Sequence, residues 1–276
     1  MKIAINTWMY SSFPTWLPAY PIDYVINSLA DMGYDGIELG AASPVAYPPY
    51  LDKKKRDEIR AMLKDKNIEI SSVLIAPGGG CGNNVASPLE AERKQAIQNY
   101  RDCVDLASDL GGKVCNYVAG WVVWGVEQKR AWQWSKECLK EISQYAAEKG
   151  ITIPVEPTPA DSNLVETADD ALQMMEEVGM TNVKVMFDCF HAFYRGEVLT
   201  DYVDRMGKNL AYVHISDLNR TPPGTHTDFR PLIKVLKGIN YQGYLCMEIG
   251  LGGLGREGMN PNDFAEKSII YLKSII

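Results

Sequence analysis

Short apolar runs rich in β-branched residues alternate with amphipathic segments along the whole chain. The amphipathic segments repeat apolar residues at helical spacing, and many end at glycine or asparagine, as helices commonly do. The apolar runs are too short for buried helices, so we interpret them as strands. We expect strands at 2–6, 35–39, 68–76, 113–120, 151–157, 183–188, 210–217 and 243–250, and helices at 21–34, 56–67, 91–111, 135–150, 167–180, 201–209, 228–240 and 263–275.

Eight strands that each precede a helix predict a (β/α)8 TIM barrel of the α/β class. An open doubly wound sheet would alternate in the same way. Such a sheet usually carries a glycine-rich loop after its first strand, whereas residues 6–12 of this chain read NTWMYSS. The sequence contains neither a linker nor a low-complexity tract, so we expect a single domain over residues 1–276.

Composition and charge narrow the classes of partner. The net charge is −7 and the longest basic run is Lys53–Arg56, which argues against nucleic acid because phosphate binding needs a basic face. No apolar run approaches the length of about 18 residues that a membrane span requires. The N-terminal apolar stretch is too short for a signal peptide, and the six cysteines form no CxxC pair. We therefore expect a reduced, cytoplasmic protein with buried thiols and no membrane partner.

Four consecutive strands, the fifth to the eighth, finish in residues that can bind a metal. They carry Glu156, Asp188, His214 and Glu248, each about one β/α unit apart. The carboxyl ends of barrel strands meet at one rim, where active sites of this fold lie. A single acid at a strand end is usually a helix cap or a surface charge, but four in a row predict a shared site. Three carboxylates and one imidazole suit Mn²⁺, Mg²⁺ or Co²⁺ better than a structural Zn²⁺.

Further polar and aromatic residues follow the same strand ends. We interpret His191, in a loop just beyond Asp188, as an orienting group or a substrate donor. Arg220 lies six residues past His214, where it can hold substrate oxygens, and Asp161 follows the fifth strand. Tryptophans after the first and fourth strands can supply an apolar wall for a substrate, although packing on the barrel would also explain them. The candidate substrate-binding residues are His191, Arg220, Asp161, Trp8, Trp121 and Trp124.

Four sequence blocks give the chain a family resemblance. They are EP at 156–157, VKVMFDCFH at 183–191, HISDLNR at 214–220 and INYQGYLCMEIG at 239–250. With the strand pattern, they resemble the xylose-isomerase-like sugar isomerase/epimerase superfamily, and within it the D-tagatose/D-psicose 3-epimerase group. The likeness covers nearly the whole chain and is strongest between residues 150 and 250.

The resemblance implies a divalent metal, usually Mn²⁺, held by a Glu–Asp–His–Glu set that matches Glu156, Asp188, His214 and Glu248. It also implies that Glu156 and Glu248 are the acid/base pair and that His191 and Arg220 grip the substrate. A further glutamate of the family matches Asp161, on a loop that is one residue shorter here. Members of the family are often homo-oligomers, so a dimer or tetramer is implied as well.

The chemistry of epimerisation agrees with these residue types. Removing a proton from the carbon beside a carbonyl requires stabilisation of the enediolate, which a metal supplies as a Lewis acid. Inversion requires one carboxylate on each face, one to take a proton and the other to return one. Glu156 and Glu248 can flank a sugar over the metal, while His191 and Arg220 hold its oxygens. The predicted enzyme is a metal-dependent ketose or keto-sugar epimerase.

Several other functions remain open at this point. An aldose–ketose isomerase would use the same enediolate, and a lyase acting on a 3-keto sugar or inositol derivative would use one carboxylate to remove the α-proton. A phosphorylated substrate is a further option, with GLGGLGREG at 250–258 and Arg256 as its binding segment. A repair endonuclease of the superfamily is disfavoured, because the chain is acidic and has only three histidines. A binding barrel without metal or catalysis is the last alternative.

Overall fold

Eight parallel strands close into a barrel in the computed structural model, which describes residues 1–10, 20–42, 45–75, 82–250 and 260–276. Each strand pairs with the next one in the sequence, and β8 pairs with β1. The predicted (β/α)8 architecture is therefore confirmed. The strands are β1 Lys2–Asn6, β2 Gly36–Ala41, β3 Glu69–Ile75, β4 Cys115–Val118, β5 Ile153–Glu156, β6 Val183–Asp188, β7 Leu210–Ile215 and β8 Tyr244–Met247.

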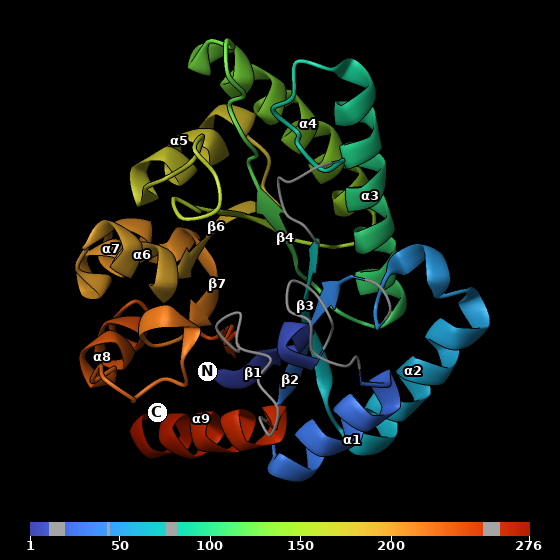
Figure 1. Cartoon of the computed structure of the whole chain (residues 1–276), viewed down its shortest axis with the longest axis vertical. Helices are drawn as coiled ribbons and strands as arrows, with labels where there is room; N and C mark the ends of the chain where they lie inside the picture. Colours follow the sequence, from blue (N-terminus) through green and yellow to red (C-terminus); the bar gives the residue numbers. More distant parts are fainter. Residues whose placement is uncertain (11–19, 43–44, 76–81, 251–259) are drawn as a thin grey trace.

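Helices surround the barrel, as Figure 1 shows in a view that places the strands at the centre. Within the described part of the chain, no helix is long and apolar enough to cross a membrane. The helices are α1 Ile22–Met32, α2 Lys53–Lys66, α3 Glu90–Asp109, α4 Gln128–Glu148, α5 Ala168–Val178, α6 Cys189–Arg195, α7 Leu199–Met206, α8 Arg230–Gly238 and α9 Pro261–Ile275. The short helix α6 was not predicted from the sequence, which indicated a loop there.

Helix α6 begins directly at the end of β6 because Asp188 caps it. The Oδ1 atom of Asp188 accepts a hydrogen bond of 2.9 Å from the backbone N–H of Phe190. Such a bond satisfies one of the N–H groups left free at the start of a helix. The helix ends at Gly196, whose φ of 70° is the left-handed conformation that favours glycine. The chain thus turns from strand to helix without a loop, which carries His191 back over the barrel rim.

The barrel interior is layered below the predicted ligands. Side chains two residues apart on a strand point to the same face. Residues two positions before Asn6, Asp188, His214 and Glu248 form one small apolar cluster. Its members are Ala4, Met186, Tyr212 and Cys246. This cluster is the floor of the site, and the much larger core between strands and helices encloses it from outside.

The five cysteines among the described residues are all buried and free: Cys103, Cys115, Cys138, Cys189 and Cys246. Burial raises the pKa of the Cys115 and Cys246 thiols to about 12. A thiol with so high a pKa is a poor nucleophile and a poor redox group. These side chains therefore act as small apolar residues, as the sequence indicated. Cys81 lies outside the described residues.

Candidate active site

The four candidate ligands converge at the carboxyl-terminal rim of the barrel. Asp188, the last residue of β6, lies in register with His214 of β7. Glu156 is the last residue of β5, and Glu248 directly follows β8. One ligand atom of each side chain lies within 4.8 Å of the others, and all four residues are buried. The residues that the sequence placed at four consecutive strand ends thus form one cluster.

Three buried atoms of this cluster make no hydrogen bond of good geometry among the described residues, although two of them are ion-paired with Arg220. They are Asp188 Oδ2, His214 Nδ1 and Glu248 Oε2. The Nδ1 atom lies 3.1 Å from Glu248 Oε2 and 3.5 Å from Glu156 Oε1. Buried polar atoms normally have a partner, and these donor atoms face one another across a small space. Oxygen and imidazole donors in this arrangement fit a divalent cation such as Mn²⁺, Mg²⁺ or Co²⁺.

Arg220 supplies the positive charge that the structure places beside these carboxylates. Its Nη1 atom lies 2.8 Å from Asp188 Oδ2 and 2.6 Å from Glu248 Oε2. The guanidinium carbon also lies 4.2 Å from the centre of the Phe190 ring, in a cation–π contact. The prediction that Arg220 reaches the barrel mouth is therefore supported by its position. Its role toward a substrate stays a prediction.

The backbone that presents Arg220 is strained and firmly anchored. Asn219 and Arg220 both have left-handed backbone conformations, with φ of 59° and 58°, which are uncommon for residues other than glycine. The buried Asp217 carboxylate holds the loop by accepting hydrogen bonds from the backbone N–H groups of Leu218, His226 and Thr227. Strain of this kind persists only where surrounding contacts impose it, and it often marks functional sites.

His191 lies in helix α6, not in the loop that the sequence indicated, and it is buried. Its Nδ1 atom accepts a hydrogen bond of 3.4 Å from the backbone N–H of Ala160. The Nε2 atom faces three carboxylates, at 3.6 Å from Asp161, 3.6 Å from Asp188 and 4.0 Å from Glu156. Burial and the nearby guanidinium of Arg220 lower the His191 pKa to about 3, so the ring is neutral at pH 7. A neutral ring that accepts at Nδ1 carries its proton on Nε2.

The two glutamates of the cluster differ in electrostatic environment. Burial raises the pKa of Glu156, and the neighbouring His214 only partly offsets that effect. Burial acts on Glu248 as well, but Arg220 and His214 outweigh it and hold the pKa of Glu248 well below its ordinary value. Paired carboxyl groups whose pKa values are pushed apart are typical of an acid and a base in one active site.

The three tryptophans predicted to line the site differ in exposure. The Trp8 ring lies against the backbone of Gly40. A Cβ atom on residue 40 would lie 1.8 Å from the ring, so only glycine leaves room for it. Trp121 is 37 % exposed, and Trp124 is fully exposed at 103 %. The connection from β4 to α4, which carries both residues, runs outward from the barrel centre in Figure 1. The aromatic wall at the site therefore stays a prediction.

Two asparagine side chains fix the start of this connection. Asn84 accepts a hydrogen bond from the Trp121 N–H at 2.9 Å and donates one to the Trp121 carbonyl at 3.1 Å. Asn163 likewise accepts a hydrogen bond from the Val122 N–H at 2.7 Å and donates one to the Val122 carbonyl at 3.1 Å. Both backbone groups of two successive residues are thus satisfied by amides from neighbouring loops, which sets the direction of the segment.

The sequence matches the family model of the xylose isomerase-like TIM barrel over residues 26–275. The chain belongs to this family. It is 25 % identical over 236 residues to a fructoselysine 3-epimerase of Shigella flexneri, covering 83 % of this chain and 85 % of that protein. It is 26 % identical over 239 residues to a D-psicose 3-epimerase of Ruminiclostridium cellulolyticum, covering 83 % and 79 % of the two chains.

Solved structures agree on the fold of this xylose isomerase-like barrel. D-psicose 3-epimerase with D-tagatose from Clostridium cellulolyticum H10 matches with a TM-score of 0.87 at 22 % identity, covering 100 % of this chain and 99 % of that one. The apo form of 3-keto-D-glucoside 4-epimerase from E. coli matches with a TM-score of 0.82 at 21 % identity and covers 99 % of each chain. The shared fold extends over the entire barrel.

One residue of this xylose isomerase-like barrel that contacts the site was not predicted from the sequence. Glu38 of β2 is fully buried inside the barrel, and its Oε1 atom lies 2.8 Å from Nε2 of His214. The signal that could have found it was a carboxylate in the middle of the apolar run GIELGA, in a strand whose every residue is buried. Such a carboxylate is costly unless it is paired.

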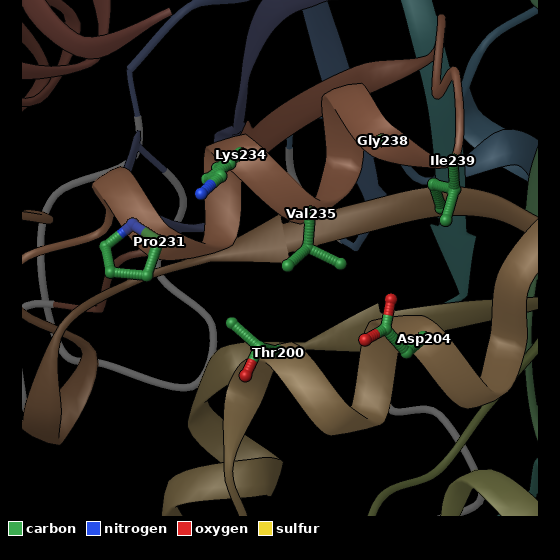
Figure 2. Close-up of a pocket in the computed structure, with 7 residues that line it drawn as sticks. All are labelled: Thr200, Asp204, Pro231, Lys234, Val235, Gly238 and Ile239. Carbon is green, nitrogen blue, oxygen red and sulfur yellow. The ribbon is translucent and has the colours of Figure 1, made fainter.

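Two other regions of the barrel lie apart from this cluster. A groove of about 530 Å³ lies between α7 and α8, lined by Thr200, Asp204, Pro231, Lys234, Val235, Gly238 and Ile239 (Figure 2). None of the predicted site residues lines it. The segment predicted to bind phosphate, with Arg256, lies outside the described residues apart from Gly250.

Proposed function

We propose that this protein is a divalent-metal-dependent epimerase that inverts the carbon beside the carbonyl of a ketose or keto sugar. The observation that carries the proposal is the buried cluster of Glu156, Asp188, His214 and Glu248, whose donor atoms fit a cation. The order around the barrel puts Glu156 on β5 and Glu248 after β8, with the other two ligands on the strands between them. The two glutamates therefore stand on either side of the cluster.

We assign the two roles from the surroundings of the glutamates, because Arg220 and His214 favour the charged form of Glu248 more than that of Glu156. Glu248 begins as a carboxylate and takes the proton from the carbon beside the carbonyl. The two electrons of the broken C–H bond form the carbon–carbon double bond of an enediolate. Glu156, in its protonated form, delivers a proton to the opposite face of the same carbon, which restores the carbonyl with inverted configuration. The reverse reaction exchanges the two roles and resets the protons.

The remaining residues position the substrate and carry charge. When bound, the cation acts as a Lewis acid toward the carbonyl side of the sugar. His191 presents an N–H to the cluster from a neutral ring, so it donates a hydrogen bond without adding charge. Arg220 offers a guanidinium to oxygens on which negative charge develops. Asp161, whose side chain is 64 % exposed, lies at the outer edge, where it can accept a hydrogen bond from a substrate hydroxyl.

The relatives support a carbonyl-bearing sugar as the substrate class. Their names include fructoselysine 3-epimerase, D-psicose 3-epimerase, L-ribulose 3-epimerase and 3-dehydro-D-guloside 4-epimerase. Each of these substrates has a carbonyl next to the inverted carbon, although the rest of the molecule differs. The shared chemistry is the one that two opposed carboxylates and a cation perform.

A substrate screen with defined metal content tests the proposal. Protein stripped with EDTA is supplied with Mn²⁺, Mg²⁺, Co²⁺ or no metal and incubated in D₂O with ketoses, keto-glycosides and inososes. We expect inversion with deuterium at the inverted carbon in the metal-supplied samples, with Mn²⁺ among the active ions. Full activity in the stripped protein would refute the metal requirement. An alkene product would assign a lyase, and an aldose product an isomerase.

A further inference from the structure

Glu38 lies in the barrel interior beside His214 and has no part in the proposed proton transfer. Strand register places Asn6, Glu38 and Ser72 side by side on β1, β2 and β3. His214 comes from β7, so the contact between the two side chains crosses the barrel interior. Both side chains have no exposed surface. The pair therefore links one half of the barrel to the candidate ligand set.

Every hydrogen-bonding position of the Glu38 carboxylate is filled by a neighbour. Its Oε1 atom meets Asn6 Nδ2 at 2.5 Å and His214 Nε2 at 2.8 Å. Its Oε2 atom accepts from Asn116 Nδ2 at 2.8 Å and from the Ser72 hydroxyl. A carboxylate offers about four acceptor sites, so none is left over.

The orientation of the Asn6 amide is fixed independently. Its Oδ1 atom accepts a hydrogen bond of 2.7 Å from the Trp8 N–H, so Nδ2 is the atom that faces Glu38. The Oε1 atom of Glu38 therefore accepts a hydrogen bond from Asn6, and it acts as an acceptor toward His214 as well. The partner atom His214 Nε2 must then carry a hydrogen. In the neutral ring, the lone pair is left on Nδ1.

We propose that Glu38 is a positioning residue that fixes the tautomer, ring orientation and basicity of His214 for a divalent cation. This inference rests on the proposed metal-dependent function. The Nδ1 atom of His214 points to the cluster, at 3.1 Å from Glu248 Oε2. A carboxylate behind a metal-binding imidazole orients the ring and makes it a stronger donor, and loss of such a partner typically costs about 10–100-fold in metal affinity.

A purely structural role would not require a charge at this position. Uncharged side chains fill the adjacent layer of the interior, Ala4, Met186, Tyr212 and Cys246. Burying a carboxylate is expensive even when it is well paired, and apolar replacements of buried ion pairs are often neutral or stabilising. Four donors directed at one buried carboxylate thus indicate a function for its charge, which the contact with His214 supplies.

Glu38→Gln is the discriminating variant because it removes the charge and keeps the size. The glutamine oxygen can still accept from His214. Its NH₂ group can meet Asn116 Oδ1, which is buried without a hydrogen-bond partner, if the Asn116 amide rotates. Ser71→Ala is the matched control. Ser71 lies in β3 and is buried like Glu38, but its hydroxyl contacts the Tyr212 hydroxyl at 2.7 Å and not Glu38. Circular dichroism and the melting temperature of each metal-free variant report on folding.

The main measurement is the Kd for Mn²⁺ alone, without sugar, by competition with a chelator. We expect the Kd to rise about 10–100-fold in E38Q, and to change less than threefold in S71A. Folded E38Q that binds Mn²⁺ within threefold of the wild-type Kd would overturn the proposal. A wild-type protein that does not bind Mn²⁺, Mg²⁺ or Co²⁺ would instead overturn the proposed metal site itself.

Nitrogen-15 NMR of the imidazoles gives a readout that does not depend on whether E38Q folds. The chain has three histidines, so the His214 signals are assigned by comparison with His191→Gln and His226→Gln proteins. In wild-type protein saturated with diamagnetic Mg²⁺, we expect the hydrogen on Nε2 and none on Nδ1. A hydrogen on Nδ1 would overturn the proposal even if E38Q does not fold.

Discussion

Replacing each cluster glutamate by glutamine separates the two halves of the proposed reaction. Glu156→Gln and Glu248→Gln keep the size of the side chain and one oxygen. In the first variant, the amide oxygen can still face His214 Nδ1, which lies 3.5 Å from Oε1 of Glu156. In the second, the amide oxygen can still accept from Arg220, whose Nη1 atom lies 2.6 Å from Oε2 of Glu248. Each variant therefore retains its local contacts and loses the ability to take or return a proton.

Each substitution should greatly reduce the rate of inversion, and it should abolish solvent exchange for only one of the two epimers. Removing a general acid or base costs about 10²–10⁴-fold in rate, or about 3–5 kcal/mol of activation free energy at 1.36 kcal/mol per factor of ten. With Glu156 replaced, Glu248 can still remove the proton from one epimer and return a deuteron to the same face. With Glu248 replaced, Glu156 can do so only for the other epimer. Each variant should thus exchange one epimer without inverting it, and the two variants should select opposite epimers.

Proton NMR in D₂O, started separately from each epimer, measures both processes. Manganese content of every sample is determined first, so that loss of metal is not mistaken for loss of proton transfer. Glu166→Gln serves as the charge control, because Glu166 lies on the same loop as Asp161 and pairs with Arg195 at the surface. Unchanged inversion in either variant would refute the two-base reaction. Exchange of both epimers by one metal-loaded variant would show a single base acting on both faces.

Three further predictions concern stability and the rim. Burial opposes protonation of His214, but the negative charges of Glu38 and Glu248 outweigh burial and raise the His214 pKa well above its ordinary value. Protonation of His214 therefore stabilises the folded protein fully below about pH 6.5, and this stabilisation is lost as the pH rises through the folded-state pKa. The melting temperature of EDTA-treated protein should therefore fall at alkaline pH. A melting temperature that does not change with pH would contradict the raised pKa of His214. Trp124→Ala should change the free energy of unfolding by less than about 0.5 kcal/mol, because the side chain is fully exposed; if the predicted aromatic wall exists, the ratio of kcat/KM values among sugars should shift. Asn163→Ala should cost about 1–3 kcal/mol by leaving both Val122 backbone groups unpaired, measured by urea denaturation, whereas Gln98→Ala, at an exposed position of α3, should cost less.

The strands were predictable because the sequence pattern and the burial agree. Parallel barrel strands are covered on both faces and appear as continuous apolar runs, as in β7, where only Ala211 is partly exposed. Helix α6 was not predictable in the same way. Its sequence CFHAFYR follows VKVMFD with no polar break or glycine between them. The helix starts there because the Asp188 side chain caps it, and nothing in the pattern distinguishes a capping aspartate from a ligand at a strand end.

The four clustered residues were predictable because barrel topology alone brings consecutive strand ends together. Glu38 required more than topology. Both faces of β2 are buried, so the sequence pattern does not show whether Glu38 points into the barrel or toward the helices. Only the register of Asn6, Glu38 and Ser72 puts it inside, and only the closure of the barrel brings His214 within 2.8 Å of it. Contacts across the interior join residues far apart in the sequence, and no local pattern carries them.

Charge balance explains why these residues occur together. Glu38, Glu156, Asp188 and Glu248 bring four carboxyl groups into a buried volume in which like charges repel strongly. Among the described residues, Arg220 provides a permanent positive charge against two of them, and His214 contacts three. Burial, and after it repulsion from the neighbouring carboxylates, raises the pKa values of Glu156 and Asp188, so both groups resist carrying a charge there. A divalent cation held by Glu156, Asp188, His214 and Glu248 would complete the balance, which couples metal binding at this rim to the release of protons.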